Sequence, residues 1–339
     1  MSKYWDIGRI LPYQRRFNFI NGPRSIGKTY TTQKFLIKKA LNENKQFVYV
    51  VRTKQEIQSG AFEQAFEKVC DREYKDIEFK WENDTLLYKD ACGCYIVLGY
   101  CLALSNYAKL KMRSFPQVYY WLMDEYMLED NSTARYINGW REPDIALSLY
   151  HTIDREEDRV TCFFLGNNTT FYNPYHLHPA FRIPQIKPGG IWTSENVLFQ
   201  WAKPSDELSE SKKKSKFLRM IDGTDYSRYS IGGEYIEDNE SFIEEKPGNP
   251  HFVFSVVYGG QTYGVWRDNN RLLTFIDQKI DPYGRICYAL DMNEHSNHTV
   301  LSKRDPYLNW LIKDFKNGNV RFVSGEVKKK AEMFIASII

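Results

Sequence analysis

Short apolar runs alternate with amphipathic segments over the first half of the chain. Residues 17–20 make one apolar run, and residues 46–52 (QFVYVVR) make a second that is apolar almost throughout. The segment between them, residues 29–44 (TYTTQKFLIKKALNEN), has the apolar spacing of a helix that ends near Asn42. Because a strand that is apolar on both faces is typical of a covered parallel sheet, this order predicts a strand, helix, strand unit.

The alternation continues to about residue 170. Further apolar strands are expected at 95–104, 118–126 and 160–168, with a helix near 55–70 and a polar hairpin around 78–90. Strands and helices in this order favour an α/β domain whose sheet is mostly parallel. We assign residues 1–200 to this domain.

The pattern changes after about residue 180. Turn-forming residues and a lysine-rich stretch predict a short linker domain over 201–241. Beyond it, three strand-like runs are separated by a Gly-Gly and an Asp-Asn-Asn turn, which predicts a β-meander. Helical segments near 305–317 and 326–338 would pack against the meander, giving a small α/β domain over 242–339.

The composition is that of a globular protein. The 339 residues are 42% hydrophobic and 16% aromatic, enough for a substantial core. No apolar run approaches eighteen residues and the N-terminal segment does not resemble a signal peptide, so we expect a soluble cytosolic protein with no membrane partner. Six scattered cysteines favour free thiols. Cys92-Gly-Cys94 and His176-Leu-His178 resemble halves of a metal site, but neither has a second half at zinc-finger spacing.

The net charge of +3 is too small to indicate a polyanionic partner by itself. Basic residues do gather at 212–216 and at 328–330. Clusters of this kind either bind nucleic acid by releasing its counterions or form an ordinary solvated surface, and the sequence leaves both alternatives open.

Residues 22–29 (GPRSIGKT) match the phosphate-loop pattern G-x-x-x-x-G-K-[ST] at every specified position. The glycines let backbone N–H groups face a β-phosphate, Lys28 would reach the β- and γ-phosphates, and the Thr29 hydroxyl would bind Mg²⁺. An apolar strand before the loop and a helix after it distinguish the match from an ordinary glycine-rich turn. We expect nucleotide contacts from Gly22, Pro23, Arg24, Ser25, Ile26, Gly27, Lys28, Thr29 and Tyr30.

Polar residues also stand at the ends of two later strands. Asp124 follows six apolar residues and would bind Mg²⁺ through water, and Glu125 beside it would act as the base that polarises the attacking water. The alternative is a strand that merely ends in two acidic residues. Asn167 ends the next strand, where it either touches the γ-phosphate or the lytic water or forms a turn.

Two arginines, Arg155 and Arg159, come just before that strand. An arginine offered to the γ-phosphate by a neighbouring subunit stabilises the charge of the transition state. Most arginines among acidic residues instead form surface ion pairs, and the sequence leaves both interpretations open.

Taken in order, several segments resemble one family of proteins. They are "NFINGPRSIGKTY", "KQFVYVVRTK", "KMRSFP…WLMDE", "DREEDRV…LGNN…NPY", "FLRMIDGTDY" and "FVFSVVYGGQTYGVW". Together they are similar to the genome-packaging ATPases (encapsidation proteins) of phi29-like tailed phages, which are related to large terminase ATPases. The resemblance extends over most of the chain, including the linker and the C-terminal segments.

The resemblance implies an additional-strand, conserved-Glu (ASCE) P-loop ATPase that uses ATP and Mg²⁺. It implies a homo-oligomeric ring, expected as a pentamer, at the portal vertex of an empty procapsid. The ring would move double-stranded DNA inward from the host cytoplasm and would be absent from the mature virion. In the best-known relatives a structural RNA bridges the ring to the capsid.

The resemblance also assigns residues. Arg155 matches the arginine that acts on the neighbouring subunit, Lys111 matches a lysine offered across the same interface, and Lys54 matches a candidate DNA contact in the pore. The family often has two arginines after the second strand, but Val51 occupies the first position here. This departure weakens a role for Arg52 as a switch that holds Glu125 inactive.

The domain over 242–339 resembles an RNase H-like fold, which cuts DNA with clustered carboxylates and two metals in large terminases. The strand "FVFSVVYGG" carries no carboxylate where that chemistry needs its first one, and Asp277 and Asp291 alone do not supply the set. We expect a nuclease-inactive domain that binds DNA, RNA or the portal. The alternatives are a terminase with an active C-terminal nuclease, another P-loop nucleic-acid translocase, and a scaffold whose phosphate loop is vestigial.

Overall fold

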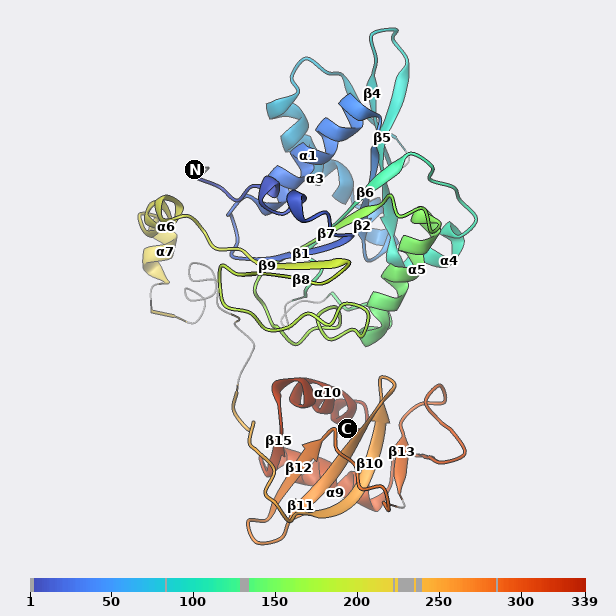
Figure 1. Ribbon diagram of the computed structural model, residues 1–339, viewed down its shortest axis with the longest axis vertical. Coiled ribbons are helices and arrows are strands. Elements are labelled where there is room, and N and C mark those ends of the chain that lie inside the picture. Colours follow the sequence, from blue (N-terminus) through green and yellow to red (C-terminus); the bar gives the residue numbers. More distant parts are fainter. Residues whose placement is uncertain are drawn as a thin grey trace. The chain divides into compact units, whose positions relative to one another are not determined.

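A computed structural model describes residues 3–82, 84–128, 134–221, 223–224, 235, 240–284 and 286–339. Contacts divide the chain into two units, Met1–Glu237 and Asp238–Ile339, and each is described by itself (Figure 1). Part of the expected linker over 201–241 lies outside the described residues, as do the side chains of Lys212 and Lys213. A separate linker domain and its boundaries therefore stay predictions.

The first unit is built on a nine-stranded sheet with the order β3-β4-β5-β2-β6-β7-β1-β9-β8. The strands are β1 (Phe17–Asn21), β2 (Gln46–Val51), β3 (Phe79–Glu82), β4 (Thr85–Lys89), β5 (Tyr95–Ala103), β6 (Val118–Asp124), β7 (Thr161–Gly166), β8 (Ile191–Thr193) and β9 (Val197–Trp201). Every pair from β5 to β9 in this order is parallel, and the outer strands pair antiparallel. The mostly parallel α/β sheet expected from the sequence is confirmed. Because β7 lies between β1 and β6, the order has the additional strand of the ASCE class.

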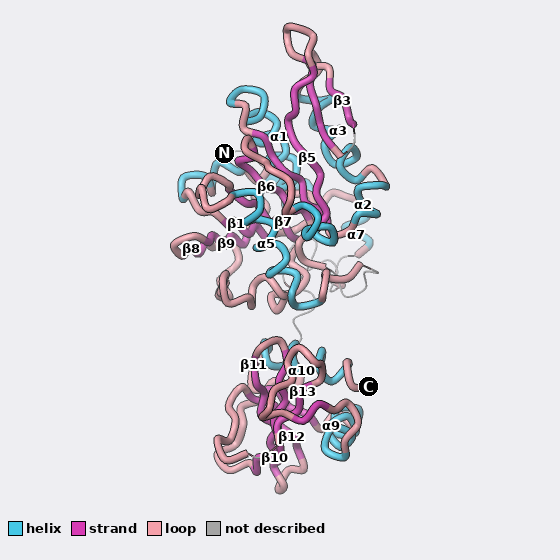
Figure 2. Tube along the Cα trace, turned by 90° about the vertical axis from the view of Figure 1, so that its right-hand side faces the viewer, coloured by secondary structure: helices cyan, strands magenta, loops and turns pink. Residues whose placement is uncertain are grey.

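Helices cover both faces of this sheet (Figures 1 and 2). They are α1 (Lys28–Glu43), α2 (Lys54–Gln58), α3 (Ala61–Glu73), α4 (Tyr107–Leu110) and α5 (Glu142–Asp154). Two further helices, α6 (Asp206–Lys213) and α7 (Lys216–Met220), follow β9 and lie beside the sheet in Figure 1. On one face, Leu36 and Phe66 from α1 and α3 pack into one apolar core, whereas Leu149 from α5 packs into a second core on the other face. Burial on both faces explains why the central strands are apolar throughout.

Four local features differ from the sequence-based expectation. The helix expected near 55–70 is two helices, because Gly60 adopts a left-handed conformation with φ of 78°. The strand expected to reach residue 126 ends at Asp124, because Glu125 also has a positive φ. Helix α5 and the strand pair β8 and β9 were not expected. Strand β9 is short but fully buried beside β1, so its place in the sheet depends on distant pairing rather than on local periodicity.

The second unit has a six-stranded sheet with the order β14-β13-β10-β11-β12-β15. Its elements are β10 (His251–Tyr258), β11 (Gln261–Asp268), β12 (Leu273–Asp277), β13 (Cys287–Ala289), β14 (Val300–Leu301), α9 (Pro306–Lys316), β15 (Val320–Phe322) and α10 (Gly325–Ala336). The meander β10-β11-β12 is antiparallel, as expected, and β13 and β14 extend it in parallel beside β10. A meander followed by parallel strands agrees with the expected RNase H-like arrangement.

Both C-terminal helices lie within two residues of their expected bounds and pack on the apolar core of this sheet. In the part of the chain that is described, no helix combines the length and the apolar character that crossing a bilayer requires.

Candidate active site

The candidate site lies where three neighbouring strands end. Strands β1, β6 and β7 are parallel, so their carboxyl ends meet at one edge of the sheet, where α/β proteins bind ligands. The loop after β1 there faces the ends of the other two strands across a cleft of about 310 Å³. Its lining comprises Arg24, Ser25, Ile26, Gly27, Lys28, Thr29, Tyr30, Asp124, Glu125, Gly166 and Asn167.

The loop from Gly22 to Thr29 has the backbone geometry of an anion-binding turn. A Cβ on Gly22 would lie 2.8 Å from the Ala202 carbonyl oxygen, so a larger residue does not fit without a backbone shift. Gly27 has φ of 97° and caps the start of α1, whose first residues, Lys28, Thr29 and Tyr30, line the cleft. The buried Lys28 Nζ donates to the carbonyl oxygens of Gly22 (2.7 Å) and Pro23 (2.9 Å). The predicted loop residues are therefore brought together by one turn.

Asp124 and Thr29 form the oxygen-rich part of the cleft. Burial raises the pKa of Asp124, the neighbouring Glu125 adds to this rise, and a hydrogen bond from Thr29 and the charge of Lys28 act against it. A carboxylate and a hydroxyl are the hard oxygen ligands that Mg²⁺ prefers, with waters and phosphate oxygens completing its coordination. Within the described ranges no cluster of three or more metal-ligating side chains occurs. The two residues fit a metal held jointly by protein and nucleotide.

Glu125 is exposed at the turn that ends β6. Its φ of 55° is a left-handed conformation that costs a residue with a Cβ some backbone strain. Its N–H donates to Asp124 Oδ1 at 3.1 Å. The carboxylate remains available to a water in the cleft, as a general base requires.

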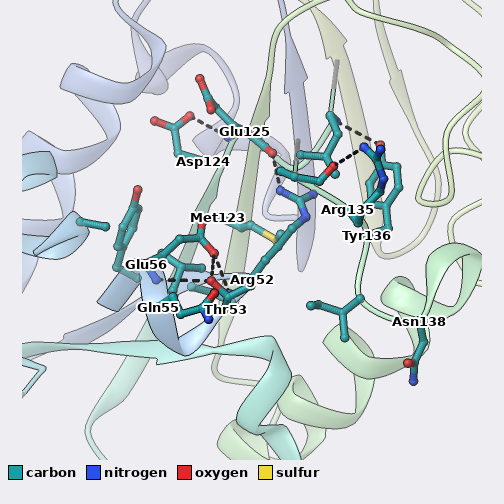
Figure 3. A pocket seen from close by; sticks show the side chains of 17 residues that line it. Arg52, Thr53, Gln55, Glu56, Met123, Asp124, Glu125, Arg135, Tyr136 and Asn138 are labelled. Carbon is teal, nitrogen blue, oxygen red and sulfur yellow. Dashed lines mark hydrogen bonds between the residues drawn. The ribbon is translucent and has the colours of Figure 1, made fainter. Parts of the chain in front are cut away.

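A second cleft of about 740 Å³ shares Asp124 and Glu125 with the first (Figure 3). Arg52, which directly follows β2, lines this cleft. Its guanidinium donates to the carbonyl oxygens of Glu125 (2.9 Å) and Tyr126 (2.5 Å). In Figure 3 the carboxyl groups of Asp124 and Glu125 point away from this guanidinium. The ion-pair partner of Arg52 is the fully buried carboxylate of Glu142 at the start of α5. Arg52 thus holds the backbone of the Glu125 turn.

Sequence reasoning did not identify Glu142. The two partners of this pair are 90 positions apart, and Glu142 stands at a helix start, where an acidic residue is ordinarily explained by the helix dipole. Its zero exposure is what distinguishes it, and exposure is not visible in the sequence pattern.

Three buried polar side chains, Tyr126, Asn21 and His176, contact one another near the same edge of the sheet. The Tyr126 hydroxyl lies 2.6 Å from both Asn21 Oδ1 and His176 Nε2. Burial lowers the pKa of His176 to about 3, so this imidazole is neutral at pH 7. His178 contacts Asp144 instead, at 3.0 Å. The two histidines face different partners, and the hypothesis of a metal half-site is not supported within the described residues.

Arg155 and Arg159 have different surroundings. Arg159 is largely buried, and its guanidinium donates to the carbonyl oxygens of Val118, Phe115 and Ile153. Arg155 is exposed after the end of α5 and donates to the Arg113 carbonyl oxygen at 3.3 Å. Arg155 does not line the phosphate cleft of its own chain. Of the two arginines, only Arg155 has an exposed side chain.

The remaining predicted residues lie on the surface. Lys111 is exposed in the loop before β6, with Nζ 5.4 Å from the centre of the Tyr107 ring. Lys54 is exposed at the first position of α2, beside but outside the second cleft. Cys92 and Cys94 are free, exposed thiols in a hairpin turn, where Asp90 Oδ1 accepts from both of their N–H groups.

Known proteins resemble this chain over its whole length. A family model described as Podovirus DNA encapsidation protein (Gp16) matches residues 1–338. The chain is 32% identical to the DNA packaging protein of Bacillus phage phi29 over 342 residues, which covers 98% of this chain and 97% of that protein. It is 30% identical to the DNA packaging protein of Bacillus phage B103 over 318 residues, which covers 92% and 94% respectively.

Solved structures give the same result. The chain resembles a chain of the bacteriophage phi29 viral genome packaging motor assembly with a TM-score of 0.77 and 29% identity over the full length of both. It also resembles the N-terminal domain of the DNA packaging ATPase from bacteriophage phi29, with a TM-score of 0.52 and 26% identity over 60% of this chain and 99% of that one.

Proposed function

Because the chain belongs to the Podovirus DNA encapsidation protein (Gp16) family, we propose that it hydrolyses ATP and uses the energy to move double-stranded viral DNA into a procapsid. The observation that carries this proposal is the cleft at the ends of β1, β6 and β7, which brings Lys28, Asp124 and Asn167 together. A phosphate loop facing an acidic strand end is the arrangement that phosphoryl transfer needs.

Each residue of the cleft has a part in the proposed reaction. The N–H groups of the loop and Lys28 bind the phosphates. Thr29 and Asp124 would hold Mg²⁺, which would supply positive charge beside the phosphate oxygens. Glu125 accepts a proton from the attacking water, and Asn167 orients that water or the γ-phosphate. Arg24, at the cleft mouth, contacts the phosphates or the next subunit. The Lys28 amine replaces its present loop carbonyl partners with phosphate oxygens when nucleotide enters.

The proposal includes a homo-oligomeric ring, as a pentamer, in which Arg155 and Lys111 complete the neighbouring subunit's site. Its support is that both side chains are exposed and lie outside their own phosphate cleft. An arginine supplied to a γ-phosphate across an interface contributes roughly 10³ to 10⁵ in rate.

The proposed ring acts in the host cytoplasm at the portal vertex and is not retained in the mature virion. Lys54 contacts the DNA backbone, and the unit from residue 238 binds DNA, a structural packaging RNA or the portal. The support is the full-length likeness to a chain of a genome packaging motor assembly.

ATP turnover measured with and without double-stranded DNA and procapsids tests the motor. We expect DNA to increase turnover and added salt to suppress that increase steeply, because phosphate contacts release counterions. Lys28→Ala should abolish turnover while leaving the fold intact by circular dichroism. Equal turnover in the presence and absence of DNA and procapsids would refute the motor, and retained turnover in Lys28→Ala would refute the phosphate-loop assignment.

Mixed rings test the role across the interface. Arg155→Ala and Glu125→Ala should each be inactive alone, whereas a mixture of the two should recover part of the ATP turnover, since some interfaces combine an intact arginine with an intact base. No recovery at any mixing ratio would contradict action on the neighbouring subunit.

A further inference from the structure

We propose that Glu142 is a positioning residue for ATP hydrolysis: through Arg52 it fixes the backbone turn that carries Glu125. This inference rests on the function proposed above, because it assigns Glu125 as the base. It concerns a buried pair whose own residues, Arg52 and Glu142, do not line the phosphate cleft and do not belong to the loop of residues 22–29.

The first part of the argument is the way Arg52 is used. Its guanidinium has five N–H donors in a rigid plane, and here they serve two targets at once. Two nitrogens donate to the consecutive carbonyl oxygens of Glu125 and Tyr126. The Nε donates to both oxygens of Glu142, at 3.1 and 3.0 Å. A lysine could not make these contacts together, so the geometry requires the arginine fork.

The second part is the way Glu142 is held. Besides Arg52, its Oε2 accepts from the Ile137 N–H at 2.7 Å and its Oε1 accepts from the Tyr175 hydroxyl at 2.9 Å. Burial raises the pKa of Glu142, and the Arg52 charge counteracts that rise. A carboxylate with both oxygens satisfied and no exposure has one rotamer, so Arg52 has one position too.

The third part is the conformation that is being held. Glu125 has a positive φ, which is unfavourable for a residue with a side chain and persists where its surroundings determine it. Carbonyl hydrogen bonds from Arg52 on this residue and the next restrain the turn from the side opposite its carboxylates. A base must lie within hydrogen-bond reach of its water, and a misplacement of about 1 Å costs on the order of 100-fold in rate.

The experiment measures kcat, KM and ATP affinity for Glu142→Gln, with Glu142→Asp as the conservative variant. We expect Glu142→Gln to lower kcat by about 10- to 100-fold while KM and the affinity for Mg²⁺-ATP change less than about threefold, because the phosphate loop is untouched. Glu142→Asp keeps the charge and should recover part of kcat. Arg52→Lys, which keeps the charge but loses the fork, should match Glu142→Gln.

The matched control is Asp314→Asn, which neutralises a carboxylate paired with Arg267 in the second unit. It should leave kcat unchanged even where it lowers the melting temperature. In a Glu125→Gln background that retains measurable residual turnover, adding Glu142→Gln should cause no further loss of kcat, because both changes act through one group. An additive loss would overturn the proposal.

Three other results separate the possibilities. Normal kcat in both Glu142→Gln and Arg52→Lys would overturn the positioning role while wild-type turnover still supports the ATPase. Absence of turnover in the wild-type chain would instead refute the proposed function. If Glu142→Gln does not fold, Arg52→Lys decides by the same split between kcat and KM.

Discussion

The two sheets of this chain both carry buried or half-buried aspartates, but they use them differently. Asp124, at the end of β6, faces a cleft and stands next to a second carboxylate, Glu125. In the second unit, Asp277 at the end of β12 forms an ion pair with Lys246 at 2.9 Å, and Asp314 on helix α9 pairs with Arg267. The carboxylates that end β6 face an open cleft, whereas Asp277 and Asp314 are each paired with a cation.

An RNase H-like fold does not by itself indicate nuclease activity, which depends on where its carboxylates lie. Two-metal hydrolysis needs several carboxylates whose oxygens converge on one point. Lys246 lies against Asp277 and over the Trp266 ring, so a cation already occupies the space beside this carboxylate. Asp291 is exposed and its Oδ1 accepts from the N–H groups of Asn293 and Glu294. In the described part of this domain, no three metal-ligating side chains come together.

The largest effect should come from exchanging one aspartate in each sheet for asparagine. Asp124→Asn should reduce ATP turnover by on the order of 100-fold or more, because it removes the negative charge that we propose holds Mg²⁺ through water. Asp277→Asn should leave basal turnover within about twofold of wild type. Steady-state ATP hydrolysis by the two purified variants measures the difference.

For the free energy of unfolding, we expect the opposite order: Asp277→Asn should have the larger effect and Asp124→Asn the smaller one. Asp277→Asn leaves Lys246 without its partner and should cost about 2–4 kcal/mol of unfolding free energy in the second unit. Asp124→Asn relieves a buried carboxylate whose pKa is raised and should not destabilise the first unit. Urea unfolding of the full chain resolves this; equal costs for both variants would contradict the comparison.

The features of the candidate site that depend on short stretches of sequence could be predicted. The phosphate loop, Asp124 and Asn167 are each marked by a motif or by the end of an apolar run, and parallel pairing of β1, β6 and β7 then brings them together. Arg52 with Glu142, and Tyr126 with His176, were not predictable, because each pair joins distant segments through buried polar contacts. The spacing of apolar residues indicates which face of a helix or strand is buried. It does not indicate which polar residues from distant segments are buried against each other.

Within the first unit, Arg159 and Arg155 should differ in their contribution to stability. Arg159→Ala should destabilise the chain by about 2–4 kcal/mol, because it removes the donors of three main-chain carbonyl groups in a largely buried place. Arg155→Ala should change stability by less than about 0.5 kcal/mol, since it loses one long hydrogen bond on the surface. Thermal unfolding of both variants measures this. A large loss for Arg155→Ala would indicate a structural arginine and would weaken its proposed role on the next subunit.

A smaller effect is expected from pH. His176 has a pKa of about 3 in the folded chain and an ordinary value of 6.5 when unfolded, so only the unfolded chain takes up a proton between these values. Stability should therefore be complete above pH 6.5 and fall as pH decreases, by about 2 kcal/mol at pH 5. Urea unfolding of wild type and His176→Asn from pH 5 to 8 measures it. The difference in unfolding free energy between the two proteins should shrink toward low pH, and a constant difference would contradict a neutral His176.

We expect no DNA cleavage by this chain. With Mn²⁺ and supercoiled plasmid DNA, the full chain should produce no nicking or linear product, because Asp277 of the second sheet is paired with Lys246 and Asp314 of helix α9 with Arg267. Asp277→Asn should behave identically in this assay, and a known nuclease on the same plasmid provides the positive control. Cleavage by the wild-type chain that disappears in Asp277→Asn would show that this carboxylate does bind a metal. The second sheet would then use a carboxylate for chemistry, as we propose for the first, and the distinction between the two sheets would fail.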